Sequence, residues 1–474
     1  MGRNNRKNQN FILEKVSIGN VAAEGKCVAR YDNQVIFVEG VAPGDVADLL
    51  VTNKKKSFME AKPLKFHEYS PFRQLPFCAH FKVCGGCKWQ HINYDTQLEY
   101  KRQQVIDNLE RIAKVALPEI NPILASPQDR YYRNKLEFTF SNKRWLTTEE
   151  IKSEGKLSRN ALGFHIPKRF DKIINVEHCH LQPDPSNTIR VQVRGYAEAH
   201  NLSFFDMVEQ TGFLRNLIIR NTTSGEIMVI VQFAYQDDVE IENLMGFLEK
   251  RFPEISSLLY IVNTKKNEIF HDLPVITYAG KPYITEEMEG LQFRIGPKSF
   301  FQTNALQAYE LYRIARDFAG LTGQEIVYDL YTGTGTIANF VAKNALKVIG
   351  LEYVPEAIDD AIVNSQINNI NNTVFYAGDI QDLLNDTLIN QHGQPDVVIT
   401  DPPRAGMHVN VVEMLLKIKA PKIVYISCNP ATQARDLALL DQKYKVLKVQ
   451  PVDMFPHTQH VENIVLLRLR GEDE

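Results

Sequence analysis

The stretch Glu325-Ile-Val-Tyr-Asp-Leu-Tyr-Thr-Gly-Thr-Gly-Thr336 decides how the C-terminal part of the chain folds. It begins with an apolar run that is typical of a buried strand, and an apolar helical pattern follows it. The two glycines between them, Gly333 and Gly335, let the backbone approach a ligand that lies beside the start of the helix. The stretch therefore predicts a strand, a glycine-rich ligand-binding loop and a helix.

The same alternation continues toward the C-terminus. Further strand candidates are separated by apolar helical segments: KVIGLEYV from Lys347, DVVITDPP from Asp396 and KIVYISC from Lys422. Strands that alternate with helices are typical of βαβ units and a parallel sheet. From about residue 305 onward we therefore expect an α/β domain with a Rossmann-like architecture.

Two classes of enzyme bind a nucleotide cofactor at such a loop. Gly333-x-Gly335-x-x-Ala338 matches the dinucleotide fingerprint of dehydrogenases, and Glu352 at the end of the next strand could bind ribose hydroxyls in either class. Asp401, however, ends a later strand and is followed by a rigid Pro-Pro, which is typical of nucleic-acid methyltransferases. The sequence favours a methyltransferase that uses S-adenosylmethionine, with a dehydrogenase as the alternative.

The composition is that of an ordinary globular protein of 474 residues, for which about three domains are expected. No apolar run approaches the ~20 residues of a membrane helix. The first ten residues contain no apolar segment of a secretory signal. We therefore expect a cytoplasmic protein with no membrane partner, in which clustered cysteines bind metal or take part in catalysis.

Residues 11–66 alternate short apolar runs with turns such as Gly19-Asn20, which predicts a small β-barrel. Residues 1–66 hold 11 Lys and Arg against 7 Asp and Glu, in a chain whose net charge is −3. This basic excess is either solvated surface or a site for nucleic-acid phosphates. In residues 18–19, 25–30 and 38–45 the segment resembles the TRAM domain, an OB-like RNA-binding barrel.

Four of the six cysteines form a candidate metal set, with three in one loop and one far along the chain: Cys78, Cys84, Cys87 and Cys179. Two glycines in the loop let the backbone fold so that the sulfurs converge. Four thiolates suit a [4Fe–4S] cluster or a tetrahedral zinc ion. Three close cysteines and one distant cysteine favour the cluster; with zinc, His178 and His180 are possible further ligands.

Residues 131–290 hold strand candidates such as EIMVIVQFA and predict a mixed, mostly β domain. At its start, Arg130-Tyr-Tyr-Arg-Asn-Lys135 places aromatic residues among basic ones, which suits splayed single-stranded RNA or an ordinary strand with a solvated face. We expect three domains: the barrel at 8–68, a central domain with the cysteine set at 69–290, and the α/β domain at 291–474.

Cys428 ends the strand candidate KIVYIS and is held there by the turn Asn429-Pro430. A free cysteine is more often a buried core residue than a reactive one. Cys428, however, follows the Asp401-Pro-Pro strand by one strand, at the edge where a cofactor and a substrate would meet. It is therefore a candidate nucleophile.

Together these motifs resemble the RNA 5-methyluridine methyltransferases. The resemblance rests on the cysteine set and on five further motifs in family order: Ser299-Phe-Phe-Gln-Thr-Asn304, Asp329-Leu-Tyr-Thr-Gly-Thr-Gly335, Asp401-Pro-Pro-Arg404, Ser427-Cys-Asn-Pro430 and His460-Val-Glu462. The chain is most similar to the branch that carries a TRAM domain and an iron–sulfur cluster and modifies 23S ribosomal RNA.

The resemblance implies a reaction and a set of residues. Cys428 would add to C6 of a uracil so that C5 can accept a methyl group from S-adenosylmethionine, and Glu462 would then remove the C5 proton. Five residues would line the cofactor site beside the glycine loop: Gln302, Tyr331, Glu352, Asp379 and Asp401.

The resemblance also implies the partner. Because the tRNA-modifying branch generally lacks the barrel and the cluster, it implies 23S ribosomal RNA as the substrate of a monomeric enzyme that does not act on DNA. A tRNA uridine is the alternative substrate. A non-catalytic RNA-binding assembly factor is the alternative function.

Overall fold

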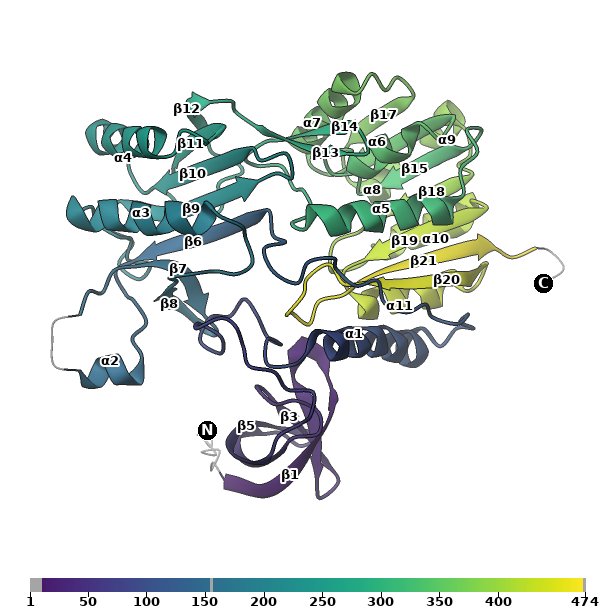
Figure 1. Ribbon diagram of the computed structural model, residues 1–474. Helices are drawn as coiled ribbons and strands as arrows, with labels where there is room; N and C mark the ends of the chain where they lie inside the picture. Colours follow the sequence, from purple (N-terminus) through teal and green to yellow (C-terminus); the bar gives the residue numbers. More distant parts are fainter. Residues whose placement is uncertain (1–10, 154–156, 472–474) are drawn as a thin grey trace, which may run out of the picture.

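The computed structural model describes residues 11–153 and 157–471, which form a barrel and two seven-stranded sheets (Figure 1). Residues 8–10 of the expected first domain and the basic residues Arg3, Arg6 and Lys7 lie outside the described residues.

The N-terminal barrel is closed, as the turn pattern predicts, and its strands run in the order β1-β2-β3-β5-β4. The five strands are β1 (Phe11–Val21), β2 (Cys27–Tyr31), β3 (Gln34–Val38), β4 (Val46–Lys54) and β5 (Phe58–Glu68). Alternate side chains such as Leu13, Ile36 and Leu49 fill the interior. Closure leaves no unpaired strand edge for aggregation.

The central sheet is mixed and has the order β12-β11-β10-β9-β6-β7-β8. Its strands are β6 (Lys135–Ser141), β7 (Ala161–Ile166), β8 (Arg169–Asn175), β9 (Leu214–Asn221), β10 (Ile227–Phe233), β11 (Ser257–Val262) and β12 (Ile276–Gly280). Helices α3 (Ser186–Ala199) and α4 (Asp238–Arg251) cover one face, and the short α2 (Thr148–Lys152) lies apart from the sheet (Figure 1).

The C-terminal sheet has the order β17-β16-β15-β18-β19-β21-β20, in which β21 runs antiparallel to both of its neighbours and every other pair is parallel. Its strands are β15 (Ile326–Leu330), β16 (Lys347–Glu352), β17 (Thr373–Ala377), β18 (Val397–Thr400), β19 (Lys422–Ser427), β20 (Tyr444–Val452) and β21 (Glu462–Leu469). The order reverses between β15 and β18. Ligands of such folds bind outside the carboxyl ends of the strands at this switch point.

Helices cover both faces of this sheet, because its strands are apolar on both sides. One face packs against α5 (Ala305–Ala319), α6 (Thr336–Ala342), α7 (Pro355–Ile367) and the hairpin of β13 (Ile284–Met288) and β14 (Leu291–Ile295). The other packs against α8 (Ile380–Leu383), α9 (Asp386–His392), α10 (Val409–Ile418) and α11 (Pro430–Leu440). This is the α/β architecture that the sequence predicts.

Helix α1 (Tyr94–Asn108), which continues into a π-helical turn (Leu109–Ala113), also lies on this sheet. Its Val105 is fully buried in the same core as the strand residues Tyr328 and Tyr425. The helix packs against α11 and β20, although it precedes the central sheet in the chain. The division at residues 68 and 290 stays a prediction, with α1 attached to the last of its three parts.

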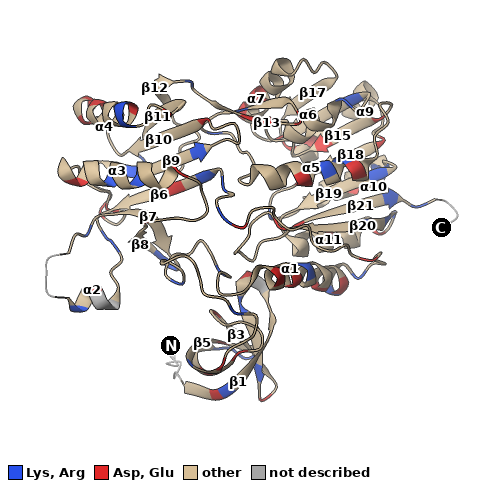
Figure 2. Ribbon diagram, in the orientation of Figure 1, with Lys and Arg blue, Asp and Glu red and all other residues tan. Residues whose placement is uncertain are grey.

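Basic residues lie where the central sheet faces the C-terminal one (Figure 2). Lys135 at the start of β6 pairs with Arg220 at the end of β9. Arg220 donates hydrogen bonds to the carbonyls of Gly296 at 3.1 Å and Ser299 at 2.8 Å, so these ends contact the segment that leads into α5. Within the described ranges, no helix has the length and apolarity needed to cross a membrane.

Gly335 is the tightest point of the ligand loop and provides a test of the fold. Its φ is +71°, and an added Cβ would lie 2.7 Å from Cβ of Ala361 on α7. We expect Gly335→Ala to lower the free energy of unfolding by about 2–5 kcal/mol, because it adds a clash to the cost of left-handed backbone. Gly290→Ala, at φ +78° with no atom within 4 Å, should cost only about 1–2 kcal/mol. If urea denaturation gave the same loss of unfolding free energy for both variants, the predicted clash at Gly335 would be wrong.

Candidate functional site

The glycine loop connects β15 to α6 and is fastened to the end of β16. The Gly333 amide donates a hydrogen bond to Oε2 of Glu352 at 3.0 Å, and the Thr332 amide donates to the Leu351 carbonyl at 3.0 Å. Gly333 has φ +55°, and a Cβ there would meet no atom within 4 Å. The backbone is therefore open to a ligand at this point, as the sequence predicts.

Asp329 lies beneath this loop and is completely buried. The Thr332 hydroxyl donates a hydrogen bond to one carboxyl oxygen, while the other has no partner among the described residues. Burial, opposed by that hydrogen bond, and the nearby charge of Asp401 raise the pKa of Asp329 to about 7. The floor of the site therefore keeps an acceptor that the protein itself does not satisfy.

The loops after β18 and β19 are joined to each other. Asp401 follows β18, and the carbonyl of Arg404 in the same loop accepts hydrogen bonds from Asn429 Nδ2 at 3.0 Å and Thr432 Oγ1 at 3.2 Å. Asn429 directly follows Cys428 and caps α11. The bonds hold the Asp401 loop beside the residue that ends β19.

Glu462 reaches the same edge from the other direction. Strand β21 runs antiparallel to β19, with Asn463 opposite Ser427, so Glu462 at its start lies next to Cys428. Glu462 is 4% exposed, and Cys428 is half-buried. The structure thus brings together three of the predicted site residues, Asp401, Cys428 and Glu462, from three different strands.

These three groups share an excess of negative charge. Burial raises the pKa of Asp401 to about 7, and burial together with Asp401 raises that of Glu462 to about 8. Burial and the two carboxyls raise the pKa of the Cys428 thiol to about 11, against a lowering effect of Arg404. Without a ligand, the thiol is therefore protonated at neutral pH. A bound cation would lower all three pKa values.

The other predicted cofactor residues lie along the same edge. Gln302 is buried, and its backbone carbonyl accepts a hydrogen bond at 3.0 Å from Nδ2 of Asn134, the residue before β6. Burial, then the charges of Asp436 and Asp379, raise the pKa of Tyr331 to about 12. Asp379 follows β17 and caps α8 by accepting from the Gln381 amide at 3.1 Å.

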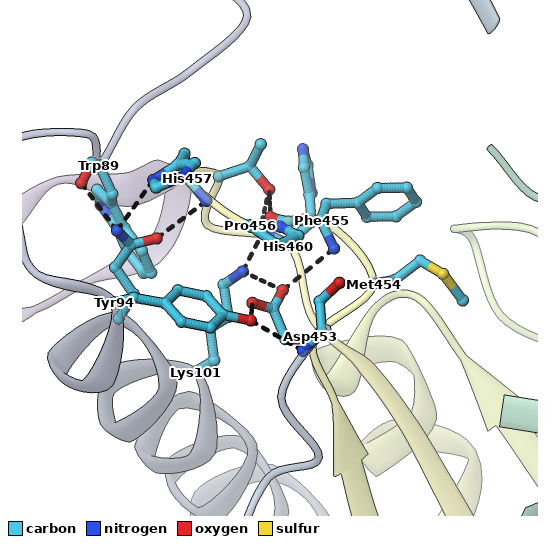
Figure 3. A network of polar contacts seen from close by, with 12 residues as sticks. Trp89, Tyr94, Lys101, Asp453, Met454, Phe455, Pro456, His457 and His460 are labelled. Carbon is cyan, nitrogen blue, oxygen red and sulfur yellow. Dashed lines mark hydrogen bonds and ion pairs between the residues drawn. The ribbon is translucent and has the colours of Figure 1, made fainter. Parts of the chain in front are cut away.

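The sequence did not reveal two contributors to this region. Tyr312 on α5 is buried, and after burial the charges of Asp401, Asp329 and Glu462 raise its pKa. Its helical spacing makes it look like an ordinary core residue. Lys101 of α1 forms a fully buried ion pair with Asp453 in the loop before Glu462 (Figure 3). Because Lys101 belongs to a helix rich in Gln, Glu, Lys and Arg, the sequence indicates an exposed side chain at this position.

The SFFQ motif also contains one residue with two possible roles. Phe300 could stack on a base or lie in the core. It is 69% exposed, whereas its neighbour Phe301 is buried. Phe300 is therefore available to a ligand.

The four cysteines of the candidate metal set line one cavity of about 340 Å³ between the central sheet and the linker, residues 69–93, which joins β5 to α1. Burial raises the pKa of Cys84 to about 11 and that of Cys87 to about 12, with further contributions from neighbouring thiols. In residues 11–153 and 157–471, no three His, Cys, Asp or Glu side chains are arranged as ligands of one metal ion. The predicted convergence is present, but a closed ligand shell is not.

Comparison with known proteins gives one family. Residues 278–470 match the family model described as tRNA (Uracil-5-)-methyltransferase. A protein of Bacteroides thetaiotaomicron named as an uncharacterized RNA methyltransferase is 60% identical over 454 residues, which are 95% of this chain and 100% of that protein. A protein of the same description from Porphyromonas gingivalis is 56% identical over 460 residues, with 95% and 99% covered.

A solved structure extends the match to the whole fold. The tRNA (uracil-54, C5)-methyltransferase of Pyrococcus abyssi, in complex with S-adenosyl-L-homocysteine, superposes with a TM-score of 0.74 at 28% identity. The match covers 95% of this chain and 100% of that one.

The raised pKa of Glu462 predicts a pH-dependent stability. The unfolded chain ionises this carboxyl near pH 4.5, whereas the folded protein holds the proton to about pH 8, so the free energy of unfolding falls across this window. Glu462→Gln removes that loss. The melting temperature of the variant should match the parent's near pH about 4 and exceed it by a few degrees at about pH 8.

Glu249→Gln, on the exposed side of α4, controls for the loss of a carboxylate. A Glu462→Gln difference that stays constant between these pH values would show that Glu462 ionises normally in the folded protein.

Proposed function

The chain belongs to the RNA (uracil-5-)-methyltransferase family, and from this premise we propose that it transfers a methyl group from S-adenosylmethionine to C5 of a uridine in RNA. The observation that carries the proposal is the convergence of Cys428, Glu462 and Asp401 at the carboxyl edge of the sheet, next to its switch point. A non-catalytic assembly factor would not need a thiol and a buried acid side by side.

The proposed methyl-donor site runs from the glycine loop to Asp401. Glu352 fixes the loop and would bind ribose hydroxyls, Tyr331 and Asp379 would lie along the adenosine, and Gln302 would face the donor and the uracil. The unsatisfied oxygen of Asp329 and the carboxyls of Asp401 and Glu462 make the site suitable for a cation. S-adenosylmethionine would supply an electrophilic methyl group on a positively charged sulfur.

The proposed reaction assigns separate steps to Cys428 and Glu462. The Cys428 thiolate would form a bond to C6 of the uracil as the electron pair of the C5–C6 double bond moves toward C5. C5 would then take the methyl group as the bond between that group and the donor sulfur breaks. Glu462 in its ionised form would accept the proton that C5 still carries, after which the S–C6 bond would break and the thiolate would leave. A base with a pKa near the working pH suits this step. Asp401 would accept a hydrogen bond from N3 of the uracil.

For the RNA we propose a path along the face between the sheets, beside Lys135. The exposed Tyr131 and Arg130, whose guanidinium lies 4.4 Å over the Phe77 ring, suit unstacked bases. The target uridine must leave its own stack to reach Cys428. We propose that the barrel, in the predicted domain at residues 8–68, is a TRAM domain that holds the RNA on either side of the target uridine.

We propose 23S ribosomal RNA as the substrate, on the presence of the cysteine set; the barrel does not discriminate, because the tRNA enzyme of Pyrococcus abyssi matches 95% of this chain and therefore part of the barrel as well. A transfer RNA is the second candidate, because the Pyrococcus abyssi enzyme that matches over 95% of this chain acts on a tRNA uracil. Transcripts of both RNAs, each incubated with labelled methyl donor, distinguish the two.

We also propose that the cysteine set binds a [4Fe–4S] cluster, with zinc as the alternative. Cys78, Cys84, Cys87 and Cys179 line one cavity, and four thiol donors with no carboxylate among them suit either group. The cluster would hold the linker against the central sheet.

Removal of the thiol tests the proposed function. Cys428→Ala should lower the rate of methylation about a thousandfold or more, because no other group can add to C6. The parent should form a covalent adduct with RNA that contains 5-fluorouridine when the methyl donor is present, since fluorine at C5 prevents the final elimination. An adduct in Cys428→Ala, or none in the parent, would refute the assignment. Cys27→Ser, in the barrel core, is the matched control.

Metal analysis tests the cysteine set. Anaerobically purified protein should contain about four iron and four sulfide ions per chain, and Cys87→Ser should lose most of them. Cys27→Ser should keep them, because Cys27 donates its S–H to the Val41 carbonyl in the barrel. If the protein were colourless and contained about one zinc ion per chain, the cysteine set would bind zinc and not a [4Fe–4S] cluster.

A further inference from the structure

The loop of residues 453–461 leads directly into Glu462 and is held by one buried ion pair (Figure 3). Nζ of Lys101 on α1 lies 2.5 Å from Oδ1 of Asp453, and both side chains are completely buried. Asp453 follows β20 directly. The ion pair therefore holds the first residue of the loop, and the last residue of the loop directly precedes Glu462.

Lys101 also binds the backbone of the loop. Its ammonium donates a second hydrogen bond to the Phe455 carbonyl at 3.0 Å, while the Phe455 amide donates to Asp453 Oδ1 at 3.1 Å. The Tyr94 hydroxyl donates to the other carboxylate oxygen at 2.9 Å. One ammonium group thus closes a turn of three residues and ties it to α1.

A second anchor holds the middle of the same loop. His457 has a left-handed backbone, with φ +63°, which a non-glycine residue adopts only when its surroundings impose it. Its amide donates to Gln97 Oε1 at 2.9 Å, and its carbonyl accepts from the Lys88 amide at 2.8 Å and the Trp89 amide at 3.0 Å. The path of the loop is therefore dictated by α1 and the segment before it.

Stability alone does not explain a buried ion pair. Desolvation of two charges offsets most of their attraction, and an apolar pair of similar volume often stabilises a fold as well or better. The ion pair does fix the orientation of the loop, because the ammonium must donate to the Asp453 carboxylate and to the Phe455 carbonyl at the same time. A device of this kind is useful where the position of a neighbouring group matters.

We propose that Lys101 is a positioning residue for the proton-removal step, and that it acts through Asp453 and Phe455 to place Glu462 beside the uracil C5 that Cys428 presents. The inference rests on the proposed function, and it concerns one step of it. Addition of Cys428 and methyl transfer depend on β18 and β19, whereas proton removal depends on the loop that Lys101 fixes.

The experiment separates these steps. Lys101→Met removes the ammonium, and Lys101→Met with Asp453→Asn does so without leaving a buried charge unpaired. Both variants should form the covalent adduct with 5-fluorouridine RNA as the parent does. With ordinary uridine RNA, turnover should fall about tenfold to a hundredfold, because base catalysis contributes on this scale. The covalent RNA–protein adduct should accumulate, since elimination then lags behind addition.

Val105→Ala is the matched control, one turn further along α1. Val105 is fully buried in the core between α1 and the sheet, so its truncation destabilises the helix packing without touching the loop. Below its melting temperature it should turn over ordinary RNA without adduct accumulation.

Three results would be decisive against the inference. Unchanged turnover in both Lys101 variants would show that Glu462 needs no such placement. Loss of the 5-fluorouridine adduct together with turnover would show general damage to the site. Adduct accumulation in Val105→Ala would show that any weakening of α1 has this effect. Failure of the parent to form the 5-fluorouridine adduct would instead refute the proposed function itself.

Discussion

The ion pair between Lys101 and Asp453 fixes the turn at which the three parts of the structure meet. The two residues are 352 positions apart in the chain, and both are inaccessible to solvent. The same loop after β20 is also bonded to the central part, because the Tyr132 hydroxyl donates a hydrogen bond to the Pro456 carbonyl at 3.0 Å. Trp89, which binds this loop, donates its ring N–H to Gly25 near the barrel at 3.2 Å. Barrel, central sheet and C-terminal sheet thus meet at one turn.

The chemistry at the carboxyl edge follows from a second constraint, an excess of buried acid. Burial and then the charge of Asp401 raise the pKa of both Asp329 and Glu462, and Arg404 lowers that of Glu462. While no cation is bound, burial and the Glu462 and Asp401 carboxyls keep the Cys428 thiol protonated at neutral pH. A positively charged donor would relieve the repulsion, so binding of the donor and readiness of the thiol are coupled through charge rather than through movement of the chain.

The parts of the fold and site that the sequence predicts are those specified by local pattern. The glycine loop, Asp401 and Cys428 each follow an apolar strand, and parallel strands bring such positions to one edge. Glu462 needed the family resemblance, because its strand is antiparallel and its neighbours look like an ordinary surface turn. The packing of α1 on the C-terminal sheet could not be predicted, since Lys101 in a polar helix shows no sign of burial until its distant partner is known.

The topology of β21 has a consequence for the newly made chain. This strand is the last of the sheet in chain order, yet it inserts between β19 and β20 and carries Glu462 to the centre of the site. Cys428 and the glycine loop therefore leave the ribosome before Glu462, the proposed base. Helix α1 emerges earlier still, with a lysine whose partner has not been synthesised. Under the proposed mechanism, a nascent chain would therefore lack the group that removes the C5 proton until β21 has been placed between β19 and β20.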